Sequence, residues 1–360
     1  MTSTTAHPGA GGSGPARRDE DGRDERGGTA GSRTVRRRPS LRGPIWLVWR
    51  QHRMVLGVLL AGSAAGAVWC TELRGRMADF IDAHHIAGCS MISLVPRCAH
   101  TQDTVIAFRG SYGPALQLLE LGLVLLPVLI GMFIGAPLIA RELESGTDQL
   151  VLTQSVAPLR WLRAKVGLPA LVVVIATSGF SAAFAWLWQV AGDEVSGSYW
   201  YSVRGFNALG PVPVAYALLG LATGVLVGLL LRRTVASMAV TMLAMVVVQF
   251  GLGQLRPYLM PTVTTEFRPG VAAQLPDDSW GLEQGFYTRS GAHLTDQDLA
   301  CSPQEDYDAC LPRHHVIGQY MDQHPVSHHW PLAWIEAGIV LALAAALTVF
   351  AFRVVRRRYG

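Results

Sequence analysis

Six long apolar runs, separated by charged or polar segments, dominate the chain beyond residue 50. The hydrocarbon core of a bilayer is ~30 Å thick, and a helix needs about 20 residues to cross it. Lipid offers the backbone no hydrogen-bond partner, so a run that crosses it has to be helical. The pattern therefore predicts an all-α polytopic membrane protein, with transmembrane helices at approximately 54–71, 115–140, 167–191, 211–231, 235–255 and 331–352.

Residues 1–43 have a different composition. They are rich in Gly, Ser, Thr, Arg and Asp, and they cannot bury enough apolar surface to fold. They also lack the continuous apolar core of a signal peptide. We expect a disordered cytoplasmic tail here, followed by a transmembrane domain over residues 44–360.

Apolar and aromatic residues already appear just before the first predicted span. Trp46 and Trp49 stand there among Ile45, Leu47 and Val48. Such a segment is typical of a short helix that lies in the membrane interface on the cytoplasmic face. A simple extension of the first transmembrane helix is an equally good interpretation.

Basic residues are distributed unevenly between the two sides of the predicted helices. They cluster before the first span, between the second and third, between the fourth and fifth, and after the sixth. Cytoplasmic loops carry this excess, so both termini are predicted to be cytoplasmic. The loop 141–166 is then an inner loop, and 72–114, 192–210 and 256–330 are outer loops. Because the basic residues flank the membrane, the net charge of +4 indicates contact with lipid, and no nucleic-acid partner is expected.

Two of the outer loops contain cysteine pairs with the same C-x8-C spacing. Cys89 and Cys98 lie in the first loop, and Cys301 and Cys310 lie in the last. Paired cysteines outside the membrane favour disulfides, and four cysteines allow three connectivities. We expect the two local pairs, because short loops close easily; free thiols are the alternative. The last outer loop is too long for a simple connector, so a small extracytoplasmic head is expected between the fifth and sixth helices.

The inner loop has the most distinctive pattern in the chain. The apolar helix continues into charged residues, and turn and cap residues then interrupt it. After a short apolar piece, Pro158 can begin the helix that leads into the third span. This order predicts a helix, a break, a short helix on the membrane surface and a second break, an element able to receive force from a cytoplasmic partner. The candidate contact residues are Arg141, Glu142, Glu144, Gly146, Thr147 and Arg160.

Several short runs carry a resemblance to a known family. They are Gly135-Ala136-Pro137, Ala140-Arg141-Glu142, Glu144-x-Gly146-Thr147, Thr153-Gln154-Ser155 and the Trp-Arg-Gln-His-Arg segment from Trp49 to Arg53. In these runs the chain resembles type-2 ABC exporter permeases of actinobacteria, strongly in the inner loop and weakly in the outer loops. The resemblance implies a cytoplasmic coupling helix between the second and third spans and an outer element between the fifth and sixth. It also implies a bacterial plasma membrane protein that pairs with a second copy or a paralogue and binds two ABC ATPase subunits.

The chain has no nucleotide-binding motif of its own. The G-x-x-x-x-G-K-[ST] pattern does not occur, and Lys165, the only lysine, stands in a different context. A permease of this kind binds no cofactor itself, and ATP and Mg would be held by a partner subunit. The motifs H-E-x-x-H and G-x-S-x-G of intramembrane enzymes are also absent from the sequence, so no enzyme activity is expected. The remaining alternative is a non-transporting membrane sensor or immunity protein on the same fold.

Three carboxylates lie near the outer ends of predicted spans: Glu72, Glu120 and Glu336. Ionisable residues within membrane segments often mark a transport path, and these could line an exit path for a cationic or amphiphilic substrate. Hydration at the membrane interface is the alternative, and Glu120 is the deepest of the three. Nine of the eleven histidines fall in the outer loops, where solvated side chains are common, and no metal site is expected.

Overall fold

The computed structural model describes residues 42–90, 96–146, 158–268, 278–299 and 310–359. The chain divides into two compact units, Met1–Ser40 and Leu41–Gly360, and all described residues belong to the second. The predicted tail therefore lies outside the described residues, except for Arg42 and Gly43, which begin the first helix.

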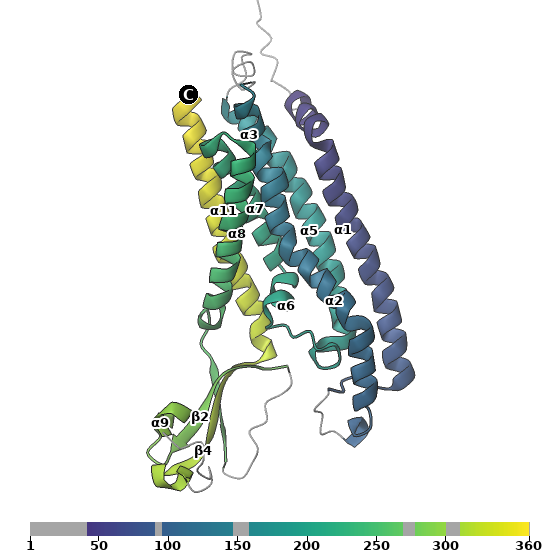
Figure 1. Ribbon diagram of the computed structural model, residues 1–360, viewed down its shortest axis with the longest axis vertical. Coiled ribbons are helices and arrows are strands. Elements are labelled where there is room, and N and C mark those ends of the chain that lie inside the picture. Colours follow the sequence, from purple (N-terminus) through teal and green to yellow (C-terminus); the bar gives the residue numbers. More distant parts are fainter. Residues whose placement is uncertain (1–41, 91–95, 147–157, 269–277, 300–309, 360) are drawn as a thin grey trace, which may run out of the picture. The chain divides into compact units, whose positions relative to one another are not determined.

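Six helical segments in the described part of the chain are long and apolar enough to cross a membrane (Figure 1). This confirms the predicted six-helix membrane fold, which is mostly helical. The second segment is continuous through a π-helical turn, η2 (Gly131–Gly135). The helices are α1 (Arg42–His84), α2 (Gln102–Ile130) with α3 (Ala136–Glu144), α5 (Pro158–Ser196), α7 (Val212–Leu231), α8 (Thr234–Leu255) and α11 (His329–Tyr359).

The first two helices extend well beyond their apolar cores. α1 continues to His84 and α2 begins at Gln102, so helix occupies much of the segment 72–114 that we expected to be a loop. The physical reason is that a helix satisfies its own backbone hydrogen bonds in water as well as in lipid. At its other end α1 is continuous from Arg42, so Trp46 and Trp49 extend the first helix and form no separate interfacial helix.

Helix α7 is the centre of the helix bundle. It contacts α2, α3, α5, α8 and α11, and most of its side chains are buried. Glycines permit the closest of these contacts: a Cβ at Gly220 would overlap the carbonyl oxygen of Pro127, and a Cβ at Gly224 would overlap that of Gly131. Small residues let transmembrane backbones approach in this way. The backbones of α2, η2 and α7 are therefore in direct contact, where the π-turn locally widens the second helix.

Between α8 and α11 the chain forms a four-stranded antiparallel sheet with strand order β1-β4-β2-β3. A small folded unit was expected in this position, but its strands were not. Short helices flank it: η3 (Arg256–Tyr258), α9 (Asp296–Leu299), η4 (Leu311–His314) and η5 (Val326–His328). The strands are β1 (Val263–Phe267), β2 (Trp280–Thr288), β3 (His293–Leu294) and β4 (Val316–His324).

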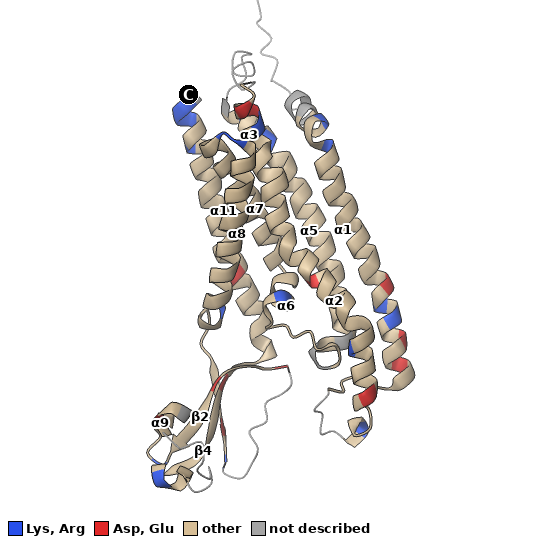
Figure 2. Cartoon of the chain, in the orientation of Figure 1, with Lys and Arg blue, Asp and Glu red and all other residues tan. Residues whose placement is uncertain are grey.

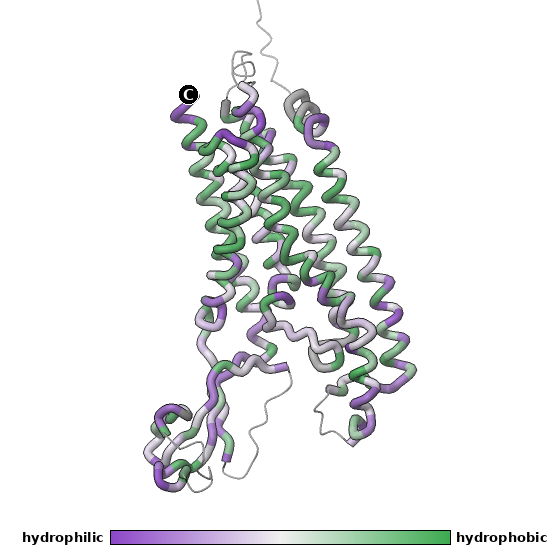
Figure 3. The backbone as a smooth tube through the Cα atoms, in the orientation of Figure 1, coloured by the Kyte–Doolittle hydropathy of each residue, from purple (hydrophilic) through white to green (hydrophobic). Residues whose placement is uncertain are grey.

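The helix bundle has two ends, which we name by what they connect (Figure 1). The loop end holds the end of α3, the start of α5, the α7–α8 turn and the last residues of α11. The sheet end holds the connections from α8 into the sheet and back into α11, and the short helix α6 (Val203–Ala208) follows the end of α5. Hydrophobic residues follow the helices between the two ends (Figure 3), and charged residues gather toward the ends (Figure 2). This distribution is that of a multi-pass membrane protein.

Candidate coupling site

The helices on both sides of the predicted coupling loop have well-defined ends. Helix α3 ends at Glu144, and Gly146 follows with a φ of +68°, a left-handed conformation that glycine adopts at helix C-termini. Helix α5 begins at Pro158, whose missing N–H costs nothing in a first turn. Residues 147–157, with Thr147 and the predicted short surface helix, lie outside the described residues.

A buried ion pair joins these two helices just behind the loop. The Lys165 side chain on α5 is 3% exposed, and its Nζ pairs with Oε1 of Glu142 on α3. The same Nζ donates to the carbonyl oxygen of Leu138 at 3.2 Å and lies 4.8 Å from the ring centroid of Trp161. A buried ammonium needs several such partners to offset its lost hydration. The ends of α3 and α5 are therefore fixed to each other by charge as well as by packing.

A second polar contact joins α3 to α8. The α7–α8 turn places Arg233 at the N-cap of α8, where it supplies no side-chain cap. Instead, Oε2 of Glu144 accepts hydrogen bonds from the backbone N–H of Thr234 at 2.9 Å and from its Oγ1 at 2.6 Å. A carboxylate at this position satisfies an otherwise unpaired N–H and complements the helix dipole. Glu144 thus acts as a capping residue supplied by a different helix.

Helix α1 also reaches this region, through His52. The imidazole lies near enough to Lys165, Glu142 and Arg141 to interact electrostatically with them. Its Nε2 is buried without a hydrogen-bond partner among the described residues. His52 belongs to the Trp-Arg-Gln-His-Arg segment, which the sequence marked only through family resemblance. Four helices, α1, α3, α5 and α8, therefore contribute polar groups to what we call the loop base: His52, Glu142, Glu144, Lys165 and Thr234.

The structure brings most of the predicted contact residues to this base. Arg141, Glu144 and Gly146 are exposed at the end of α3, and Glu142 is half-buried beside them. Arg160 is exposed in the first turn of α5, on the other side of the loop. Exposed charged residues therefore lie directly above helices that are joined by an ion pair and by hydrogen bonds. Such an arrangement suits contact with another protein.

The sequence does not by itself identify two members of the loop base, Lys165 and Thr234. Lys165 was considered only as a nucleotide-site lysine and then set aside, and Thr234 lies in the short connection between the predicted helices 211–231 and 235–255, to which no role was assigned. Their partners, Glu142 and Glu144, are 23 and 90 residues away along the chain, so no local pattern reveals the pairing. The one available signal was that Lys165 is the only lysine in an arginine-rich chain.

The three candidate carboxylates of the substrate path lie in three different settings. Glu120 is buried in α2 and accepts a hydrogen bond from the Ser198 hydroxyl. Glu336 is buried in α11 and pairs with Arg256. Glu72 is exposed on α1 and forms an i,i+4 pair with Arg76 at 3.4 Å. They share no partner, so the structure does not assemble them into one site.

The Glu336 pair is part of a buried network at the sheet end. The Arg256 guanidinium donates to both carboxylate oxygens of Glu336, at 2.7 and 2.9 Å, and to Oδ1 of Asn207 at 2.6 Å. The Tyr216 hydroxyl donates to the same carboxylate at 2.9 Å, and the ring of Phe206 lies 3.7 Å below the guanidinium. Because η3, α6, α7 and α11 all contribute, the network fixes the helices that lead into and out of the sheet.

Cysteine pairing matches the prediction where the structure describes it. Cys89 and Cys98 form the expected disulfide. Cys310 is also disulfide-bonded, and its predicted partner Cys301 lies outside the described residues. Cys70 is buried in α1 as a free thiol. Among the described residues, no group of three or more His, Cys, Asp or Glu side chains is arranged to hold a metal ion.

Comparison with known proteins identifies the family. The family model described as "ABC-2 membrane transporter related" matches residues 60–256, which include more than half of α1, the loop base apart from His52, and all of α8. No curated protein and no solved structure matches the chain. The matched region covers more than half of the 360 residues. The chain therefore belongs to the ABC-2 membrane transporter related family.

Proposed function

We propose that this protein is the membrane-spanning permease subunit of an ATP-driven ABC exporter, coupled to a separate ATPase subunit. Family membership supports a membrane transporter subunit. The observation that carries the finer proposal is the loop base, where two carboxylates at the end of α3 join it to α5, on the other side of the coupling loop, and to α8. ATP and Mg bind to the partner subunit, and this chain contributes no catalytic residue.

The polar contacts suggest how work passes from the loop into the membrane. A force on the exposed end of α3 reaches α5 through Glu142 and Lys165, and reaches α8 through Glu144 and Thr234. The α2–α7 glycine contact transmits it further, because backbones in direct contact cannot slide independently. ATP binding to the partner would then shift the population between inward-facing and outward-facing arrangements of these helices.

We also propose an orientation for the molecule in a bacterial plasma membrane. The loop end, with its arginines, the start of α1 and the end of α11, faces the cytoplasm, where the ATPase subunit is found. The sheet and the disulfides face outward, in an oxidising environment. A second copy or a paralogue completes the transporter. Among the three carboxylates we propose Glu120 for the substrate path, because it is buried within the membrane domain and its hydroxyl partner Ser198 is neutral.

The test uses the tagged full-length chain, purified with its ATPase partner and reconstituted in nanodiscs. We expect Glu144→Ala to abolish the coupling of ATP hydrolysis to the permease, seen as loss of the permease-dependent part of the ATPase rate. Glu144→Gln keeps a carbonyl acceptor for the Thr234 donors and should retain part of it. Glu72→Ala, which removes an exposed carboxylate from α1, is the matched control and should leave the ATPase rate unchanged.

Two results would overturn the proposal. One is an ATPase rate that responds equally to Glu144→Ala and to Glu72→Ala. The other is a chain that purifies from its native membrane without any ATP-hydrolysing subunit and binds a peptide or lipid independently of nucleotide. The second result would instead indicate a sensor or immunity protein on the same fold.

A further inference from the structure

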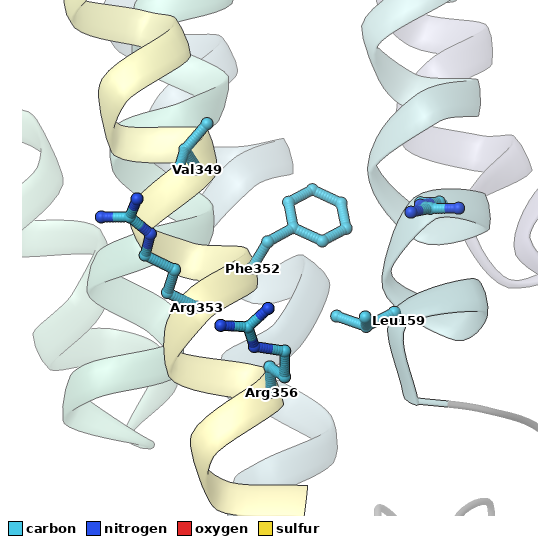
Figure 4. A pocket seen from close by; sticks show the side chains of 6 residues that line it. Leu159, Val349, Phe352, Arg353 and Arg356 are labelled. Atoms are coloured by element: carbon cyan, nitrogen blue, oxygen red, sulfur yellow. The ribbon is translucent and has the colours of Figure 1, made fainter. Parts of the chain in front are cut away.

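A pocket at the loop end is not used by the coupling mechanism. It lies between the start of α5 and the end of α11 and has a volume of ≈ 430 Å³, within the size range of small-ligand sites. In Figure 4, Phe352 extends from α11 toward α5, and Leu159 points toward it from α5. The lining side chains are Leu159, Arg163, Val349, Phe352, Arg353 and Arg356.

The charge of the lining is entirely positive. Arg163 comes from α5, and Arg353 and Arg356 come from α11; among the described residues, no acidic side chain lines the pocket. None of the three arginines forms an ion pair within the described part of the chain. Three guanidinium groups around one cavity repel one another and leave their donors to solvent, so an anion there would be favoured by charge and by hydrogen bonding.

The pocket is also divided between apolar and basic parts. Val349 and Phe352 belong to the last turns of the apolar part of the last transmembrane segment, and Arg353 and Arg356 belong to its basic C-terminal end. The apolar side chains therefore border the hydrocarbon region, and the guanidinium groups border water. A soluble anion would gain nothing from Phe352 and Val349, whereas a phospholipid has both a charged phosphate and an adjacent acyl chain.

We propose that this pocket binds an anionic phospholipid, with its phosphate among Arg163, Arg353 and Arg356 and an acyl chain along Val349 and Phe352. The bound lipid connects α5, which leaves the coupling loop, to the C-terminal helix α11. It also relieves the mutual repulsion of the three guanidinium groups. The proposal does not depend on an ATPase partner, so its test can fail or succeed independently of the proposed function.

The experiment titrates purified full-length protein with phosphatidylglycerol and, separately, with phosphatidylcholine, and counts retained lipids by native mass spectrometry. The unmodified chain should retain one phosphatidylglycerol in preference to phosphatidylcholine. Replacing Arg163, Arg353 and Arg356 by Gln should weaken that retention by roughly fivefold per arginine. Phe352→Ala should weaken phosphatidylglycerol retention while leaving three guanidinium groups in place.

The matched control removes the same charge elsewhere. Arg50, Arg53 and Arg357 are exposed on α1 and α11 and do not line the pocket; their triple Gln variant should retain the lipid as the unmodified chain does. Equal losses in the two triple variants would overturn the proposal, and so would equal retention of the two lipids. Displacement of the lipid by millimolar glycerol 3-phosphate, with no effect of Phe352→Ala, would show a soluble phosphate site and would also overturn it.

If the pocket triple variant fails to fold, the single variant Arg356→Gln tests the same site through a smaller loss of lipid retention. Its side chain is exposed, so its removal leaves no buried group unpaired. A roughly fivefold loss of phosphatidylglycerol retention, with unchanged phosphatidylcholine retention, supports the site. No change in either lipid overturns it.

Discussion

At the scale of single residues, each end of the helix bundle contains a buried ion pair that joins neighbouring helices. Lys165–Glu142 stabilises the loop end and Arg256–Glu336 the sheet end. When one partner of a buried ion pair is removed, the other charge remains out of water but no longer has an opposite charge beside it. This typically costs about 3–5 kcal/mol of folding stability. Replacing both partners with apolar residues avoids that cost. Single and double variants therefore distinguish a structural ion pair from a dispensable one.

Lys165→Met is predicted to destabilise the protein, because it leaves the Glu142 carboxylate facing a buried apolar side chain. Glu142 keeps some exposure, so we expect a loss of about 3 kcal/mol, at the low end of that range. The free energy of unfolding in mixed micelles measures it. The double variant Lys165→Met, Glu142→Leu should recover most of the loss. Additive losses in the double variant would contradict the account of this pair.

Arg256→Met is predicted to be the more damaging change. The side chains of Arg256 and Glu336 are 1% and 0% exposed, and the variant also leaves Oδ1 of Asn207 without its donor. We expect about 4–5 kcal/mol, measured in the same unfolding assay. Arg76→Met, which breaks the exposed pair with Glu72, should cost less than about 1 kcal/mol. Equal effects of the two substitutions would contradict the assignment of Arg256–Glu336 as a structural network.

At the scale of elements, the sequence predicts the helices well and their contacts poorly. Apolar runs give the six helices because membrane insertion demands length and hydropathy together. They do not give helix ends, since α1 continues past Thr71 without any apolar requirement. The sheet was missed because β1 and β2 both pair with β4, which lies far from them in sequence, and because β3 has only two residues. The loop base was predicted as exposed charges, but its cross-helix partners depend on tertiary packing that no local pattern carries.

The contact between α2 and α7 gives a prediction at this scale. Gly224→Ala should destabilise the bundle, because its methyl group would overlap the backbone of η2 and push the helices apart. Gly251→Ala on α8 has open space around its added Cβ and should stabilise by up to ~1 kcal/mol through helix propensity. Thermal unfolding of both variants in nanodiscs measures the difference. If both substitutions stabilise the protein, the α2–α7 contact is not as close as the structure shows.

The stability of the protein is predicted to depend on pH through His324, which lies at the base of the sheet. Its Nε2 lies 3.1 Å from the carbonyl oxygen of Pro257 and its Nδ1 lies 3.0 Å from Nδ1 of His328. Burial lowers the pKa of His324, and the nearby His328 lowers it further, although the Pro257 carbonyl opposes this. The unfolded chain therefore binds the proton more readily than the folded one, so stability is complete above about pH 6.5 and falls below it.

Thermal unfolding between pH 7.5 and pH 5 tests this dependence. The unmodified protein should lose stability as the pH falls through 6.5, and His324→Asn should show a shallower slope. His293→Asn is the matched control, because His293 is an exposed residue of the same sheet. An unchanged slope in the His324 variant would show that other groups are responsible.

At the scale of the whole molecule, the account depends on which side of the membrane each end faces. Arginine at the loop end and disulfides near the sheet end both favour a cytoplasmic loop end. Thr262 lies exposed at the sheet end and Ser145 lies exposed at the loop end. Cysteine at position 262 should react with a membrane-impermeant maleimide in intact cells, and cysteine at position 145 only after permeabilisation. The reverse pattern would contradict the orientation.

The most direct measurement of the central claim is photocrosslinking of the full-length chain in its native membrane. A photoreactive amino acid at Arg141, beside the loop base, should form a crosslink to an ATP-hydrolysing subunit, and its yield should change between ATP and ADP. The same amino acid at Tyr258, which is exposed at the sheet end, is the control and should form none. Crosslinks to that subunit from position 258 but not from position 141, or from neither, would contradict coupling through the loop base.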